Sequence, residues 1–180
     1  MARLLFGEEN PAGRLPFTVA RSEGQLPLVY DHLPTGRGDD YIDLTGQPLF
    51  PFGFGLSYTT FDYSALQLSA PRAGARDTVR VRFRIANTGA RAGDEVAQLY
   101  VRHVTAPSAQ PVLALRGVAR VHLAAGESRE VEIALPASAL AVRDEAGRRA
   151  LANGEVILYV GASSRDIRLR GTLTTVGDKR

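Results

Sequence analysis

The strict alternation of apolar and charged residues in VRVRFRIA, residues 79–86, limits the fold of this chain more than any other feature. Four apolar residues occupy the odd positions, and three arginines occupy the even positions between them. A period of two is typical of a β-strand with one buried and one solvated face, because successive side chains of a strand point to opposite sides. REVEIAL, residues 129–135, repeats this pattern. The chain therefore needs a second apolar layer to cover these strands.

Further strands are predicted at residues 96–104, 118–123, 140–142, 154–161 and 166–174, with glycine-containing turns between several of them, including residues 87–95. About seven or eight short strands at regular spacing are typical of an antiparallel β-sandwich. LPASAL, residues 135–140, could form one helical turn. The predicted sandwich spans residues 64–176.

The first third of the chain has a different character. Residues 1–47 are rich in turn-forming residues, and NPAG, residues 10–13, predicts a turn because asparagine, proline and glycine all favour one. Too little periodic apolar sequence is present for this segment to fold alone. We therefore expect the first 60 residues to be loosely held or to expose apolar surface.

The stretch PLFPFGFGLSYTTFDY, residues 48–63, connects these two regions and is called the seam. Its rings at Phe50, Phe52, Phe54, Tyr58 and Phe61 could stack on sugars or fill an interface between domains, and the interface is favoured. In an extended segment, positions 50, 52 and 54 would share one side and enter a common groove. The glycines of FGFG indicate tight backbone packing, because a phosphate-binding loop would need a following helix and lysine.

The carboxylates do not form an evident catalytic pair. Hydrolysis of a glycoside needs two facing carboxyl groups, roughly 5 Å or about 6.5–9.5 Å apart. Each candidate pair consists of adjacent residues in a predicted loop. Because the side chains of neighbouring residues diverge, we interpret these residues as solvated turn carboxylates. The pairs are Glu8 with Glu9, Asp39 with Asp40, Asp94 with Glu95, and Asp144 with Glu145. No catalytic residue is predicted. Arg37-Gly38-Asp39 matches a tripeptide read by adhesion receptors, but a match this short is expected by chance.

Composition argues against several other classes of protein. The net charge is +3 with scattered arginines, which does not favour nucleic-acid binding. The chain has no cysteine, and its three histidines lie far apart, so neither a metal site nor a cofactor is predicted. No apolar run is long enough for a membrane span or, at the start, for a secretory signal. The chain is expected to be cytoplasmic if it is expressed as it stands.

Several strings resemble one family of enzymes. NPAGRLPFTV, GQLPLVYDH, PTGR and the seam look like the closing segments of family 3 glycoside hydrolases, the β-glucosidase and β-xylosidase group. NTGARAGDEVAQLYV, PVLALRGVARVHLAAGES and GEVILYVGASS resemble the fibronectin type III-like domain that ends many of these enzymes. The resemblance runs from about residue 4 to residue 164 in the family's own order.

The resemblance implies a mainly β fold, an immunoglobulin/fibronectin type III-like antiparallel sandwich preceded by an irregular remnant of an α/β sandwich domain. It also implies retaining hydrolysis without a metal in an intact enzyme, whose nucleophile and acid/base have no counterpart here. The loop at residues 32–41 is expected to approach the sugar cleft of that enzyme. β-Glucosides or related oligosaccharides would then be reached only through the intact enzyme.

Three hypotheses follow for the chain itself. The favoured one is a non-catalytic C-terminal portion of a β-glucosidase-like hydrolase that supports and packs against other domains. The second is a stand-alone carbohydrate-binding module that uses the aromatic seam. The third is one half of a split glycosidase, in which a separate chain supplies the barrel and α/β domains.

Overall fold

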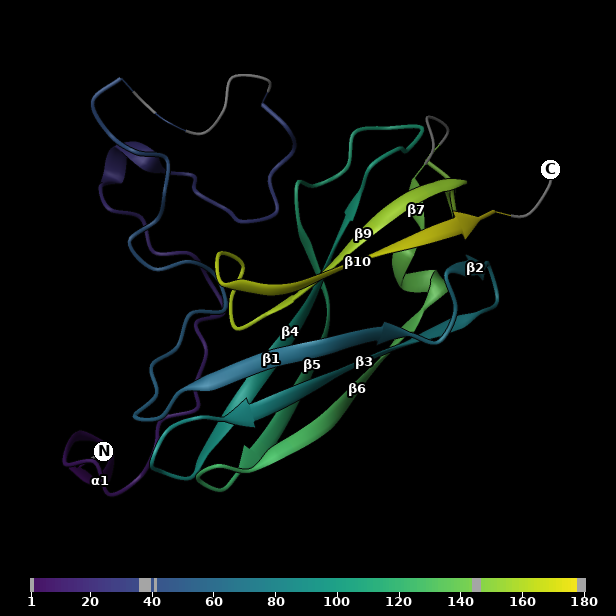
Figure 1. Ribbon diagram of the computed structural model, residues 1–180. Coiled ribbons are helices and arrows are strands. Elements are labelled where there is room, and N and C mark those ends of the chain that lie inside the picture. Colours follow the sequence, from purple (N-terminus) through teal and green to yellow (C-terminus); the bar gives the residue numbers. More distant parts are fainter. Residues whose placement is uncertain (1, 36–39, 41, 144–146, 178–180) are drawn as a thin grey trace.

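The computed structural model of the protein describes residues 2–35, 40, 42–143 and 147–177. An irregular N-terminal region lies at one side of a two-layered β structure, and the start of the chain and the end of β10 lie at opposite ends of the molecule (Figure 1). The N-terminal region contains only two short helices, α1 (Ala2–Leu5) and η1 (Glu23–Gln25), within its described residues. Nearly all regular structure therefore follows residue 60.

The first layer is a three-stranded antiparallel sheet. It contains β1 (Phe61–Leu68), β3 (Thr78–Asn87) and β6 (Ser128–Pro136), in the order β1-β3-β6. The apolar residues of β3 at the odd positions 79–85 are buried, and so are Val131, Ile133 and Leu135 of β6. The alternation in the sequence thus predicted the buried face of both strands correctly.

The second layer is a five-stranded sheet in the order β2-β10-β9-β4-β5. Its strands are β2 (Arg72–Gly74), β4 (Gly93–His103), β5 (Ala114–Leu123), β9 (Gly154–Gly161) and β10 (Ile167–Val176). All pairs are antiparallel except β2, which runs parallel to β10. The predicted mainly β, fibronectin type III-like sandwich is confirmed, with its core between the two sheets.

Short elements complete the sandwich. The predicted helical turn is present as η2 (Ala137–Leu140), and β7 (Val142–Arg143) pairs with β8 (Arg149–Ala150). The strand predicted at residues 140–142 is displaced, because Leu140 belongs to η2 and β7 begins at Val142. The strands β2 and β8 were not predicted, because strands of two or three residues carry no periodicity. The turn expected at residues 87–95 is shorter, since β4 already begins at Gly93.

The seam follows a folded path along the N-terminal segment. Val19 forms an isolated antiparallel bridge with Phe50, and the backbone of Leu15 exchanges hydrogen bonds with Gly53 and Phe54. The apolar run at residues 15–19 therefore pairs with the seam. The predicted domain boundary between residues 63 and 64 falls within β1.

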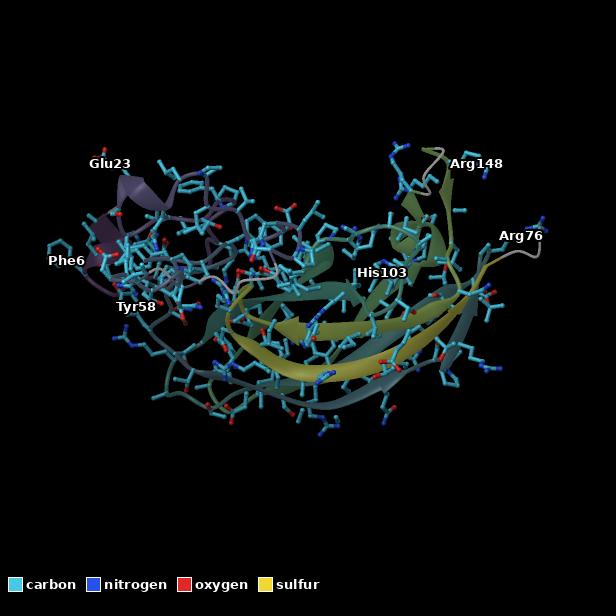
Figure 2. The ribbon with its side chains drawn as sticks, turned by 90° about the horizontal axis from the view of Figure 1, so that it is seen from above. Phe6, Glu23, Tyr58, Arg76, His103 and Arg148 are labelled. Carbon is cyan, nitrogen blue, oxygen red and sulfur yellow. The ribbon has the colours of Figure 1, made fainter. Side chains whose placement is uncertain are left out.

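Large exposed apolar side chains are concentrated before residue 61, as expected for this region; they are Leu5, Phe6, Phe17, Leu26, Val29, Leu33, Ile42, Leu49, Phe50, Leu56 and Tyr58. Figure 2 shows Phe6 and Tyr58 at the end of the molecule opposite Arg76 and Arg148. The exposed apolar surface thus belongs mainly to the N-terminal region and the seam, whereas after residue 61 the large exposed apolar residues are Val104, Val118 and Val176. Among the described residues, no helix has the length and apolar character needed to cross a membrane.

Candidate functional site: the contact between the N-terminal segment and the sandwich

The three phenylalanines of the seam do not share one side of an extended segment, so this prediction was wrong. Residues 51–54 form a turn in which the Phe54 amide donates to the Pro51 carbonyl, and Gly53 has a φ of 81°. A positive φ at this position is readily adopted by glycine and reverses the chain direction. Phe50 and Phe54 therefore meet each other, with ring centroids 5.0 Å apart. Phe52 instead stacks on Tyr30 at 4.1 Å.

The other two aromatic residues of the seam have different surroundings. Phe61 is buried and belongs to the core of the sandwich. Tyr58 is exposed, but its hydroxyl donates to the Leu4 carbonyl at 2.6 Å, and the Arg91 guanidinium lies 6.0 Å from its ring centroid. The five predicted interface residues are thus divided among two ring pairs, the core and a surface contact. Their role in packing against further domains stays a prediction.

The glycines of FGFG are closely approached by atoms from distant parts of the chain. A Cβ on Gly53 would be 2.0 Å from Gln98 Oε1, and a Cβ on Gly55 would be 2.3 Å from the Gly13 carbonyl oxygen. Gln98 is buried in β4; its amide nitrogen donates to the Gly53 carbonyl at 3.0 Å and the Ala162 carbonyl at 2.7 Å, and the Tyr100 hydroxyl donates to its oxygen. Tight backbone packing, the interpretation made from the sequence, therefore describes this stretch correctly.

Arg14 connects the N-terminal segment to the interior of the sandwich. Its Nη2 donates to Glu95 Oε2 at 3.0 Å, and the Tyr63 hydroxyl donates to the other carboxylate oxygen at 2.8 Å. Tyr63 belongs to β1 and Glu95 to β4, so this cluster joins both sheets to the segment. Burial, followed by the nearby Glu95 charge, raises the pKa of Tyr63 far above its usual range. The phenol is therefore a hydrogen-bond donor to the carboxylate.

Asparagine side chains form a second set of connections. The side chain of Asn10 donates to the Ser57 hydroxyl at 3.1 Å and accepts from the Tyr58 amide at 2.6 Å. Buried Asn87 accepts from the Thr59 hydroxyl at 2.6 Å. Residues 10–13 form no turn, contrary to the prediction from NPAG, because the Asn10 side chain bonds to the distant seam and not to the backbone nearby.

The adjacent carboxylates were interpreted as solvated turn residues, and this is wrong for Asp94 and Glu95. Both lie in β4, where successive side chains point to opposite faces. Glu95 is buried with Arg14, as described above. Asp94 accepts hydrogen bonds from His122 and Arg120, and these contacts, His122 first, hold the pKa of Asp94 below its usual value.

The remaining carboxylates of the candidate pairs also have partners where they are described. Glu8 and Glu9 are exposed and pair with Arg3. Asp40 accepts from the Gly46 amide and the Thr45 hydroxyl, which lower its pKa in that order. Asp39, Asp144, Glu145 and the Arg37-Gly38-Asp39 tripeptide lie outside the described residues. Within the described parts of the chain, no group of three or more metal-ligating side chains could hold a metal ion.

Two adjoining cavities lie between residues 18–35 and 46–51 and the outer face of the five-stranded sheet. Their volumes are about 240 and 360 Å³. They share a set of mostly polar lining residues, namely Tyr30, His32, Thr35, Ser164 and Arg165. Their described lining residues include no aspartate or glutamate, so this space has no described carboxylate pair for glycoside hydrolysis.

Comparison with known families assigns the two parts of the chain separately. Residues 1–58 match the glycosyl hydrolase family 3 C-terminal domain, and residues 95–164 match the fibronectin type III-like domain. The two matches follow the order expected from the sequence. The chain corresponds to the C-terminal part of a family 3 glycoside hydrolase.

Individual relatives agree with this assignment to family 3. A periplasmic β-glucosidase of Salmonella typhimurium is 35% identical over 178 residues, which cover 93% of this chain and 23% of that protein. A β-xylosidase of Formosa agariphila is 36% identical, covering 98% of this chain and 25% of that protein. A solved β-glucosidase structure from Erythrobacter marinus has 40% identity and a TM-score of 0.91, covering 97% of this chain and 23% of its own. The family 3 segment thus spans about a quarter of the length of these relatives.

Three residues that connect the N-terminal segment and the seam to the sandwich in this family 3 segment were not predicted from the sequence. They are Arg14, Glu95 and Gln98. A signal existed for Glu95, because it is in phase with Ala97, Leu99 and Val101, which face the core. The unbroken apolar surroundings of Gln98 in VAQLYV also indicate that both faces of this strand are covered. Arg14 carries no local signal, since its partner is 81 residues away.

Proposed function

We propose that this chain is a non-catalytic supporting module of a β-glucosidase-like hydrolase, and that residues outside this sequence cleave the glycosidic bond. The observation that carries this proposal is that the carboxylates are bound to other groups of the chain. The buried one, Glu95, is bound to Arg14 and Tyr63, and the described members of the other candidate pairs accept hydrogen bonds or form ion pairs with neighbouring groups. A carboxylate held in this way has a structural role and is not available as a base or nucleophile for a sugar.

The module would act by presenting a fixed contact surface to the rest of the enzyme. Exposed apolar residues such as Phe6, Phe17 and Phe50 lie on the N-terminal region and the seam, which are hydrogen-bonded to the sandwich at other residues. Contiguous exposed apolar surface is typical of interaction sites. In this proposal, the barrel and α/β domains cover that surface. Residues 36–39 and 41 of the loop expected to approach the sugar cleft lie outside the described residues.

The test is an activity assay with an aryl β-glucoside. We expect no turnover by the purified chain, and turnover when the barrel and α/β domains of a family 3 relative are joined to it or added as a separate chain. A Glu95→Gln variant of the chain serves as a control for residual activity. Turnover by the chain alone that disappears in this variant would contradict the proposal.

The stand-alone carbohydrate-binding alternative has less support at the seam. Phe52 uses one ring face to stack on Tyr30, and Phe50 and Phe54 contact each other, so the three rings do not form a single flat platform. The split-enzyme alternative differs only in whether the catalytic domains are on another chain, and the two-chain assay addresses it. The compartment stays a proposal as well, since the Salmonella relative is named periplasmic and the chain itself was expected to be cytoplasmic.

A further inference from the structure

The chain contains three asparagines, and they differ in whether the backbone that follows can react with them. Asparagine is a thermolabile residue, because the backbone nitrogen of the next residue can attack its side-chain amide carbon. Asn10 precedes Pro11, and a proline nitrogen carries no hydrogen. Asn87 is buried, whereas Asn153 is exposed and precedes Gly154. The sequence therefore leaves Asn87 and Asn153 for comparison in the structure.

The surroundings of Asn87 oppose this reaction. Its side-chain nitrogen donates to the Arg91 carbonyl at 2.6 Å and to the Leu123 carbonyl at 3.2 Å. The Thr88 amide, which would have to attack, donates to the Thr60 carbonyl at 2.9 Å. The branched side chain of Thr88 also restricts the approach. Both the leaving group and the nucleophile are thus held in place at Asn87.

The amide group of Asn153 is bound at its oxygen only. The Gly177 N–H donates to Asn153 Oδ1 at 2.8 Å, whereas Asn153 Nδ2 donates to none of the described residues. A donor at a carbonyl oxygen stabilises the negative charge that develops there when a nucleophile attacks the carbon. The nitrogen, which would depart as ammonia, has no such bond to break. The group is therefore activated at its carbon and free at its leaving group.

The nucleophile would be the backbone nitrogen of Gly154. Gly154 is the first residue of β9 and pairs with Thr175 at the last position of the β9–β10 ladder. The ends of regular elements open at little cost in free energy. Glycine also has no side chain to obstruct the approach. The Gly154 amide can thus become available while the rest of the sandwich stays folded.

We propose that Asn153 is a site of spontaneous deamidation in the folded chain. The Gly154 nitrogen forms a bond to Asn153 Cγ and loses its proton, while the Cγ–Nδ2 bond breaks and ammonia leaves. Water then opens the resulting succinimide ring. Attack of water at Cγ gives aspartate, and attack at the main-chain carbonyl carbon gives isoaspartate. Both products carry a carboxylate that is charged at neutral pH.

The two products differ in their effect on the C-terminal strand. Aspartate keeps the main chain unchanged, and its carboxylate can still accept from the Gly177 amide. Isoaspartate places an extra carbon atom in the main chain just before β9. The Thr175 hydroxyl donates to the Ala152 and Gly154 carbonyls, at 2.7 and 3.2 Å, so the extra atom alters the spacing of its two acceptors. Isoaspartate should therefore loosen the end of β10, where β2 also pairs.

The experiment is peptide mapping by mass spectrometry of the full chain kept in mildly alkaline buffer, beside the free peptide ALANGEV, residues 150–156. We expect the mass gain that accompanies replacement of NH₂ by OH at Asn153, with both aspartate and isoaspartate present. Conversion in the chain should be no more than about tenfold slower than in the peptide, because a strand end opens readily. An Asn153 that is intact when the peptide is fully converted would overturn the proposal, as would equally fast conversion of Asn10 or Asn87.

Urea distinguishes reaction in the folded chain from reaction in the unfolded chain. Opening of a strand end exposes little surface, so the rate should stay nearly constant in urea below the unfolding transition. A rate that rises in proportion to the unfolded fraction would assign the modification to the unfolded chain and refute the proposal.

Variants connect the modification to β10. In Asn153→Gln the longer side chain would have to close a larger ring, so this variant should not convert at this position. Freshly prepared Asn153→Asp should resemble the fresh parent chain. Hydrogen exchange at residues 173–176 should become faster in the aged parent chain and stay unchanged in aged Asn153→Gln. The same acceleration in both aged proteins would contradict the role of Asn153.

Discussion

Arg14 Nη2 lies 3.0 Å from Glu95 Oε2, and the two side chains are only 12% and 4% exposed. One partner comes from the N-terminal segment and the other from β4 of the five-stranded sheet. An ion pair removed from water in this way depends on both partners, because either charge alone would remain buried without compensation. The segment is thus connected to the sandwich interior and not only to its surface.

Replacing Arg14 should be strongly destabilising. Arg14→Met leaves the Glu95 carboxylate buried beside the Tyr63 hydroxyl without the opposite charge, so we expect a loss of about 3–5 kcal/mol in the free energy of unfolding. Urea denaturation followed by circular dichroism measures this loss. The double variant Arg14→Met/Glu95→Gln should recover part of it, because the uncompensated charge is gone.

The control for this prediction is Arg3→Met. Arg3 also pairs with two glutamates, but all three side chains are largely exposed, and such pairs contribute about 1 kcal/mol or less. If the Arg3 and Arg14 variants lost the same amount of stability, the buried pair would have no special role.

The close approach of Gly53 to Gln98 leads to a second prediction. Gly53 and Gly126 both have positive φ, 81° and 74°, but a Cβ would meet Gln98 only at Gly53 and open space at Gly126. Gly126→Ala should therefore cost about 1–2 kcal/mol from backbone strain. Gly53→Ala should lower the free energy of unfolding by a further amount of about 1–3 kcal/mol, because the new Cβ overpacks the site. Thermal or urea denaturation of the two variants gives the difference directly.

A rescue experiment tests the cause of that difference. In a Gln98→Ala background, the extra cost of Gly53→Ala should shrink, since the atoms that clash with the new Cβ are absent. An extra cost that stays unchanged would mean that the strain lies elsewhere in the turn.

A third prediction concerns pH and His103. Burial, followed by the nearby Arg116 charge, lowers the pKa of His103 below 6.5. The unfolded chain therefore binds a proton at this position at a higher pH than the folded chain does. The stability contributed by neutral His103 is fully present above about pH 6.5 and is lost as the pH falls through the folded-state pKa.

Denaturation between about pH 7.5 and pH 5 measures this effect, and His103→Gln should flatten the decline in stability over that window. His122→Gln is the comparison, because His122 is exposed beside Asp94. A decline that is equally steep in the parent chain and in His103→Gln would contradict the assignment to His103.

The fourth prediction separates stability from association. Phe6 and Phe17 are 82% and 56% exposed, so Phe6→Ser/Phe17→Ser should change the stability of the chain by no more than about 0.5 kcal/mol per site. If these residues form part of the docking surface, the double variant should restore less activity with the catalytic domains and bind less of an apolar dye such as ANS. A variant that restores full activity would remove these two residues from the proposed interface.

Strand patterns made much of the fold predictable. The odd positions of β3 and β6 alternate with charged residues, and this local period identified their buried faces. The helical turn at η2 and the tight packing of the FGFG glycines were also anticipated. These features depend on neighbouring residues in the chain, which is the range over which a single sequence is informative.

The candidate site was less predictable because its contacts span the chain. Arg14 meets Glu95, and Gln98 meets Gly53, across 81 and 45 residues. The path of the seam was predicted as extended, but the positive φ of Gly53 sends Phe52 to Tyr30 and brings Phe50 to Phe54. Such pairings are decided by tertiary packing and cannot be obtained from the spacing of aromatic residues alone.

The parallel pairing of β2 with β10 covers one end of a sheet edge. After β1 the chain crosses from the smaller sheet to the larger one, where residues 72–74 occupy the outer edge of β10 at residues 174–176. Unpaired backbone groups along a strand edge are a template for another molecule, and a short covering strand blocks that template. This crossover therefore blocks edge-to-edge pairing at residues 174–176, where another molecule could otherwise extend the sheet and start a polymer.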